Sequence, residues 1–109
     1  MGLDARVAKV DKDGNILVCF ADERLGNIAA VAEVKEELSK YLSANSVMLS
    51  RVIYSGSHSG DCLDVGLVQK LHREMKGLPT NLSEATQEFL KGLFNVVKAA
   101  LDHNLPIDF

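Results

Sequence analysis

A chain of 109 residues with 47% hydrophobic residues is long enough to bury one core and too short for two domains. Its formal net charge of -3, with 12 Lys and Arg residues spread along the chain, argues against nucleic acid as a partner. The sequence shows no secretory signal pattern and no apolar run near the ~18 residues of a membrane span, so we expect one soluble, cytoplasmic domain over residues 1–109 without membrane contact.

The first two predicted elements are strands. Residues 3–10 alternate apolar and polar side chains with an imperfect period of two, which predicts an outer strand. Residues 13–15, Asp-Gly-Asn, are a turn signal. The continuous apolar run 16–21 that follows is typical of a strand buried on both faces. We therefore predict a β-hairpin in which Cys19 is a reduced, buried core residue.

A helix is predicted next, from Asn27 as its N-cap to the polar segment 43–46. Apolar residues recur on one face of it at spacings of three and four, at Ile28, Val31, Val34, Leu38 and Tyr41. The segment Val47–Tyr54 is apolar and rich in β-branched residues, which predicts a third strand.

A second helix is predicted to start near Asp64, whose carboxylate can cap free N–H groups. Gly77 and Pro79 should end it. Its apolar face is formed by Val68, Leu71, Met75 and Leu78.

The third predicted helix is the longest and most apolar. Asn81 and Glu84 have the spacing of a capping box at its start, and its apolar positions from residue 85 to 101 cover a broad face. Asn104 can close it in the left-handed conformation, and Pro106 should leave the last residues extended. This helix should either cross the centre of the core or form a homodimer interface.

The element order predicts an α+β fold. We expect a small, mainly antiparallel sheet of three to four strands with three helices packed on one face. The order is β-β-α-β-α-α, with a further C-terminal strand as an option.

The segment Tyr54–Met75 gathers the reactive side chains. Cys62 lies just before a helix, where the dipole would lower a thiol pKa, and His58 is in the same loop. This pair is the sharpest enzymatic interpretation. No third residue orients the two side chains, however, so we expect a non-enzymatic protein without catalytic residues.

The same segment contains four residues that could bind a metal, His58, Asp61, Cys62 and His72. Their spacing matches no known ligand pattern. A helix cap at Asp61 or Asp64 and a half-exposed His72 explain the same residues, so we expect no metal and no cofactor.

The loop Ser55–Asp61 could cradle an anion with consecutive backbone N–H groups. It lacks the Lys of a P-loop and the glycine order of a dinucleotide site, and its acidic neighbours would repel an anion. We therefore do not assign an anion site. Whether a small ligand binds this loop stays open.

An acidic stretch precedes and includes the first helix. It contains five acids against two bases, Arg24 and Lys35. Such a run is usually a solvated face, and it can also steer a small protein to a basic partner. The predicted partner-binding residues are Asp22, Glu23, Glu33, Glu36 and Glu37, together with His58 and Asp61.

Two segments of the C-terminal half carry a family resemblance, YSGSHSGDCLDVGLVQKLHREMKGL and QEFLKGLFNVVKAALDHNLPIDF. They share a His-Ser loop at His58, a Leu-x-x-Glu pattern at Leu71 and Glu74, and an Asn-x-Pro-Ile-x-Phe ending at Asn104–Phe109. In these features the chain resembles the small immunity proteins of bacterial polymorphic toxin systems. The resemblance implies a cytoplasmic, non-enzymatic protein that neutralises a cognate toxin by binding it. The N-terminal half does not align, which leaves the toxin open.

Two alternatives remain beside this hypothesis. One is a small orphan ligand-binding or catalytic domain from a mobile genetic element, in which the Ser55–Asp61 loop closes over a pocket lined by Met48, Tyr54 and Met75. The other is a self-associating module with the last helix and tail in a two-fold interface.

Overall fold

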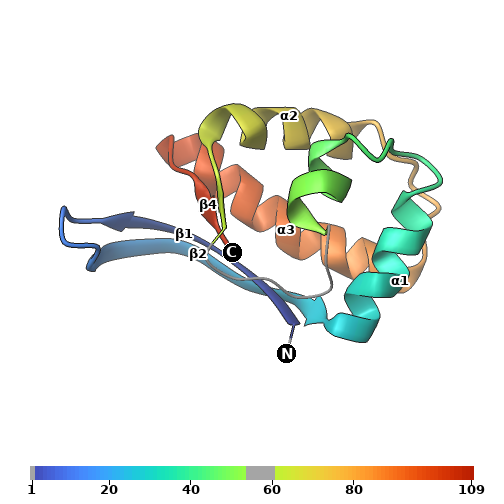
Figure 1. Cartoon of the computed structure of the whole chain (residues 1–109), viewed down its shortest axis with the longest axis horizontal. Helices are drawn as coiled ribbons and strands as arrows, with labels where there is room; N and C mark the ends of the chain where they lie inside the picture. Colours follow the sequence, from blue (N-terminus) through green and yellow to red (C-terminus); the bar gives the residue numbers. More distant parts are fainter. Residues whose placement is uncertain (1, 54–60) are drawn as a thin grey trace.

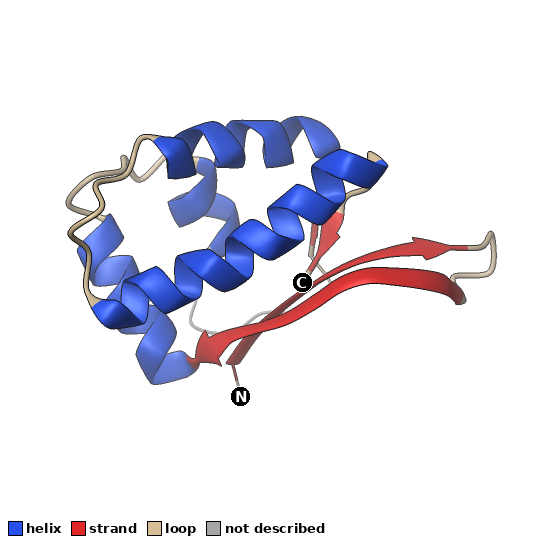
Figure 2. Cartoon of the chain, turned by 180° about the vertical axis from the view of Figure 1, so that it is seen from behind, coloured by secondary structure: helices blue, strands red, loops and turns tan. Residues whose placement is uncertain are grey.

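The structure is a computed structural model that describes residues 2–53 and 61–109. In chain order the elements are strands β1 (Gly2–Val10) and β2 (Ile16–Asn27), helix α1 (Ile28–Leu38), a short π-helical turn η1 (Met48–Val52), strand β3 (Cys62–Leu63), helices α2 (Val65–Lys76) and α3 (Glu84–His103), and strand β4 (Ile107–Asp108) (Figure 1). The strands form a 4-stranded antiparallel sheet in the order β2-β1-β4-β3. The helices lie on one side of this sheet (Figures 1 and 2), so the predicted α+β fold is confirmed.

The predicted hairpin is also confirmed. Gly14 adopts a φ of 84° at the turn, a value that residues with a Cβ rarely adopt. The Asp11 carboxylate accepts hydrogen bonds from the backbone N–H groups of Asp13 and Asn15, both at 2.9 Å. The register between β1 and β2 shifts between Leu3 and Asp4, Val7 and Ala8, and Lys9 and Val10. Each shift places an extra residue in β2, which bends and twists the ribbon.

The predicted starts of α1 and α2 are confirmed by their caps. The side chain of Asn27 accepts a hydrogen bond from the Ala30 N–H at 2.8 Å. The carboxylate of Asp64 accepts one from the Leu67 N–H at 2.9 Å. Both side chains satisfy N–H groups that have no partner inside the helix.

Helix α3 begins within residues 81–84, as predicted, but the predicted capping residue is wrong. Its N-cap is Ser83, whose hydroxyl accepts a hydrogen bond from the Thr86 N–H at 3.3 Å, and Asn81 does not cap the helix. The Ser83 hydroxyl also donates a hydrogen bond to the Glu37 carboxylate of α1 at 2.8 Å, which holds Ser83 at the start of the helix. At the other end, Asn104 closes α3 with a φ of 55°, as predicted.

Helix α3 crosses the core. Its residues Phe89, Leu93, Val96, Val97 and Ala100 are buried, and it contacts α1, α2, β1, β2 and β4. This is one of the two positions expected for it, and a homodimer interface on this helix stays a prediction. None of the helices in the described part of the chain combines the length and the apolarity needed to span a bilayer.

The strand predicted for Val47–Tyr54 is wrong. Residues 48–52 form η1, and the third strand is the short β3 instead. Val47 and Met48 donate their N–H groups to the Glu74 carboxylate of α2 at 2.8 and 3.0 Å, which stabilises the start of a helical turn. A short buried apolar run fits a helical turn as well as a strand, and the partner on α2 decides between them.

The second strand also differs from the prediction. It continues past Ala21 to Asn27, and its residues 16–20 are exposed rather than buried on both faces. Cys19, expected in the core, is exposed. The reason is geometric, because the end of the hairpin extends beyond the helices that cover the rest of the sheet (Figures 1 and 2).

Candidate functional site

Among the described residues, five of the eight exposed large hydrophobic side chains lie at the end of the β1–β2 hairpin. Val10 of β1 is 47% exposed, and on β2 Ile16 is 48%, Leu17 58%, Val18 46% and Phe20 36% exposed. Val10 pairs with Ile16 across the two strands, so these side chains are neighbours. We call Val10, Ile16, Leu17, Val18 and Phe20 the hairpin patch.

The hairpin patch is costly to leave in water. Full burial of one side chain of this size stabilises a protein by about 1.5–3 kcal/mol relative to exposure. A two-stranded ribbon without further cover is also only marginally stable on its own. In addition, β2 is an edge strand, whose outer backbone groups have no neighbouring strand in the described sheet. Contact with another protein could bury the apolar side chains, cover the ribbon and provide hydrogen-bond partners for the edge strand.

The base of the hairpin is held by an aromatic stack. The ring of Phe20 lies on the ring of His103, the last residue of α3, with centroids 3.6 Å apart and the planes 14° from parallel. Phe20 is therefore the point at which the hairpin leaves the helical layer. The patch beyond it extends from a fixed base.

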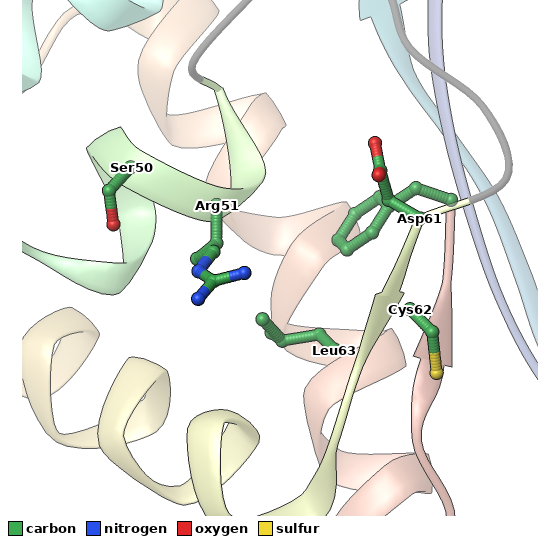
Figure 3. A pocket seen from close by; sticks show the side chains of 6 residues that line it. Ser50, Arg51, Asp61, Cys62 and Leu63 are labelled. Carbon is green, nitrogen blue, oxygen red and sulfur yellow. The ribbon is translucent and has the colours of Figure 1, made fainter.

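The segment around Cys62 lines a cavity of about 200 Å³. Its walls are formed by Ser50, Arg51, Asp61, Cys62, Leu63 and Phe109. Figure 3 shows Arg51 extending from η1 toward β3, while the Cys62 side chain points away from it on the other side of the strand. Arginine and cysteine therefore do not converge there.

Cys62 does not have the electrostatics of a nucleophile. Partial burial raises the pKa of its thiol, and the carboxylates of Asp108 and Asp64 raise it further. Asp108 lies opposite Cys62 across the β3–β4 pair. The thiol pKa is therefore raised, mainly by burial, which is the opposite of the lowering that the dyad hypothesis needs. His58, the other member of that pair, lies outside the described residues, as does most of the Ser55–Asp61 loop.

The metal-ligand hypothesis gains no support from the described residues. His72 is half-buried on α2 with its ring 6.0 Å from that of Phe94 on α3. Among residues 2–53 and 61–109, no three or more His, Cys, Asp or Glu side chains come together in a group that could hold a metal ion.

The predicted acidic residues are divided between two elements. Asp22 and Glu23 lie on β2, and Glu33, Glu36 and Glu37 lie on α1. Two of the five carboxylates accept side-chain hydrogen bonds from distant parts of the chain. Glu23 accepts a hydrogen bond from the Asn95 amide at 3.1 Å, and Glu37 accepts one from the Ser83 hydroxyl at 2.8 Å. Glu33 and Glu36 are exposed on α1.

The alternative ligand pocket is only partly within the described residues, because most of the Ser55–Asp61 loop lies outside them. Met48 is fully buried in the core, and Tyr54 lies outside the described residues. Met75 instead contributes to an apolar hollow of about 510 Å³ between α2 and α3, together with His72, Lys76, Leu90 and Phe94. Met48 and Met75 therefore do not line one common pocket.

The apolar run that forms most of the hairpin patch is visible in the sequence, but it predicted a buried strand. The run Ile16–Phe20 is apolar at every position, which is typical of a strand covered on both faces. The described residues leave every position of this run exposed.

Comparisons of this chain with protein family models, with curated proteins and with solved structures find no match.

Proposed function

We propose that this chain is a non-enzymatic protein-binding domain whose main contact surface is the hairpin patch. The observation that supports the proposal is that all residues of Ile16–Phe20 are exposed, although the run has the composition of a core strand. Exposed apolar clusters of this kind on soluble proteins are typical of interaction sites.

The chemistry around Cys62 favours binding over catalysis. The raised pKa of the thiol keeps it protonated at neutral pH, so it is a poor nucleophile. The hairpin patch, in contrast, offers apolar side chains and a free strand edge, the two features that partner proteins use most readily.

The partner class we propose is a bacterial toxin domain, which the chain would neutralise by direct binding. This proposal rests on the resemblance of the C-terminal half to immunity proteins. The exposed carboxylates Glu33 and Glu36 would add attraction for a basic partner, as would Asp22 and Asp61. His58, a further predicted binding residue, lies outside the described residues. Electrostatic attraction of this type would raise the association rate at low ionic strength.

Two isoleucines allow a matched test of the contact surface. Ile16 in the hairpin patch and Ile28 at the start of α1 are both 48% exposed, so substitution by Glu changes charge and exposed area equally. The tagged wild-type chain and the variants Ile16→Glu and Ile28→Glu would be isolated from the source cell, and bound proteins quantified by mass spectrometry. We expect a stoichiometric partner with the wild type and with Ile28→Glu, and at least a tenfold loss with Ile16→Glu.

The identity of the partner is tested by co-expression. The candidate is the product of the gene next to this one, expressed in a bacterial host that lacks both genes. We expect that product to stop growth, the wild-type chain to restore growth, and Ile16→Glu to restore it poorly. Growth arrest that this chain does not relieve would remove the toxin from the proposal and leave the protein-binding surface to be judged by the isoleucine pair.

A further inference from the structure

We infer that the apolar hollow between α2 and α3 is a binding site for a small amphiphilic anion, an aliphatic chain that carries one carboxylate. The hollow has a volume of about 510 Å³ and is lined by His72, Met75 and Lys76 of α2 and by Leu90 and Phe94 of α3. The inference goes beyond the proposed function, because the hairpin patch lies on β1 and β2 and contributes none of these residues.

The size and the position of the hollow are those of a small-molecule site. Pockets for small ligands commonly measure roughly 300–1,000 Å³, and the space between packed helices is one of their frequent positions. His72 and Lys76 are about one turn of α2 apart, which corresponds to about 6 Å along the helix axis. Leu90 and Phe94 have the same separation on α3. An aliphatic chain of medium length can therefore lie along both walls.

The surface of the hollow is mainly apolar and partly open to water. Phe94 is 43% exposed although it is a large aromatic residue, and Met75 and Leu90 are half-buried. The Phe94 ring lies beside the His72 ring, with centroids 6.0 Å apart and the planes tilted by 33°. The unbranched thioether chain of Met75 can adapt to the shape of a ligand. A ligand chain would remove the exposed part of Phe94 from water, which favours binding.

The charge of the ligand follows from Lys76. Its ammonium is the only permanent charge among the described residues that line the hollow, and no carboxylate is among them. Its neighbours one turn earlier on α2 are His72 and Arg73, so no acid pairs with it there. The acid of α2, Glu74, instead accepts hydrogen bonds from two backbone N–H groups at the start of η1, at 2.8 and 3.0 Å. A ligand carboxylate would therefore supply the counter-charge that these residues do not place at the hollow.

Other classes of ligand fit the hollow less well. A cationic ligand would be repelled by the Lys76 ammonium, with no acid among the described lining residues to offset it. A strongly polar ligand would lose hydrogen bonds to water and regain few, because His72 and Lys76 are the only polar side chains in the described lining. The hollow therefore selects an apolar body with one negative charge.

The experiment follows the methionine methyl groups of the full chain by NMR while a ligand is added. Met75 lines the hollow, whereas Met48 is fully buried in the core and serves as the internal control. Octanoate, octanol and octylammonium share one aliphatic chain and differ only in the head group. We expect octanoate to shift the Met75 signal far more than the Met48 signal. It should bind about threefold more tightly than octanol and about tenfold more tightly than octylammonium.

Two lysines of α2 give a matched pair of variants. Lys76 lines the hollow, whereas Lys70 is exposed on the same helix and does not line it. Lys76→Gln should weaken octanoate binding about threefold and leave octanol binding unchanged, and Lys70→Gln should change neither. Phe94→Ala should weaken the binding of both ligands, because it removes apolar contact that they share.

Equal affinities for octanoate and octylammonium, or an equal effect of the two lysine variants on octanoate, would overturn the inference. A Met75 signal that does not move with octanoate up to about 10 mM would overturn it as well. The inference and the proposed function fail separately. Ile16→Glu, which tests the hairpin patch, should leave octanoate binding unchanged, and Lys76→Gln should leave partner binding at the hairpin patch unchanged.

Discussion

The base and the end of the β1–β2 hairpin differ in their pattern of buried and exposed side chains, although they belong to the same pair of strands. At the base, alternate residues Leu3, Ala5 and Val7 are buried against the helices, and the residues between them are charged. Arg6 lies opposite Asp22 on β2 and opposite Asp108 on β4, so charges of opposite sign are neighbours across the sheet. This is the usual pattern of an antiparallel sheet with one covered and one solvated face.

The end of the hairpin lacks that alternation. Ile16 pairs with Val10 and Val18 pairs with Lys9, so these two exposed residues lie on opposite faces of the ribbon. Neither face of the end is therefore fully covered by the residues that the structure describes. At the base of the hairpin, the apolar side chains are buried by the helices of the same chain. At its end, the apolar side chains would be buried only by contact with another protein.

Two leucines test this difference with the largest expected effect. Leu3 at the base is 0% exposed and Leu17 at the end is 58% exposed. We expect Leu3→Ala to lower the free energy of unfolding by about 2–5 kcal/mol, because it removes buried methyl groups and leaves a cavity. Leu17→Ala should change it by less than about 0.5 kcal/mol in the isolated chain.

Chemical denaturation of the isolated chain measures both variants. Partner binding is the second part of the comparison. Leu17→Ala should weaken partner binding, while Leu3→Ala should not, as long as it remains folded. Equal destabilisation by the two substitutions would show that the end of the hairpin is covered within one copy, contrary to the structure.

The stack of Phe20 on His103 marks the boundary between the two halves. We expect the coupling between the two rings to be about 0.5–1.5 kcal/mol in a double-mutant cycle of Phe20→Ala and His103→Ala. The ring centroids are 3.6 Å apart, close enough for direct contact. Denaturation of the wild type, the two single variants and the double variant gives this value, and a coupling near zero would mean that the stack does not hold the base of the hairpin.

The sequence predicted the fold well where the signal was local. The caps at Asn27 and Asp64, the left-handed Asn104 and the turn at Gly14 each depend on one residue and its immediate neighbours, and the structure has all of them. Periodicity located all three helices for the same reason, but α1 ends at Leu38, before the predicted end at residues 43–46, and Tyr41 is exposed beyond it. These features need no knowledge of distant contacts.

The predictions failed where a distant partner decides. Residues 48–52 form a helical turn because Glu74, far along the chain, accepts the free N–H groups at its start. The run Ile16–Phe20 looks like a core strand because apolar composition reports a need for cover and does not say which molecule provides it. The sequence prediction missed the hairpin patch for that reason, because the apolar run was taken to be part of the core and not a contact surface.

The smallest expected effect concerns acid, and it separates the tip of the hairpin from the helical layer. Backbone hydrogen bonds from Asn15 and Asp13 lower the pKa of Asp11 at the hairpin turn. Hydrogen bonds from the Thr86 and Ser83 side chains lower the pKa of Glu37, which joins α1 to the start of α3. A carboxyl group whose pKa is lowered by folding stabilises the fold above its ordinary pKa, near 4, and this contribution is lost as the pH falls through the lowered value.

The two carboxylates should differ in what is lost. Glu37→Gln should reduce the acid dependence of global unfolding, because its contacts connect two core helices. Asp11→Asn should leave global unfolding almost unchanged below pH 4 and should affect only hydrogen exchange at the turn amides of Asp13 and Asn15. The reason is that the Asp11 carboxylate accepts its hydrogen bonds from residues of its own turn. Hydrogen exchange followed by NMR from pH 5 to pH 3 distinguishes the two. If Asp11→Asn shifted global acid unfolding as much as Glu37→Gln, the hairpin tip would have to unfold together with the core. The end of the hairpin would then be coupled to the core like its base, and the distinction between the two parts would be wrong.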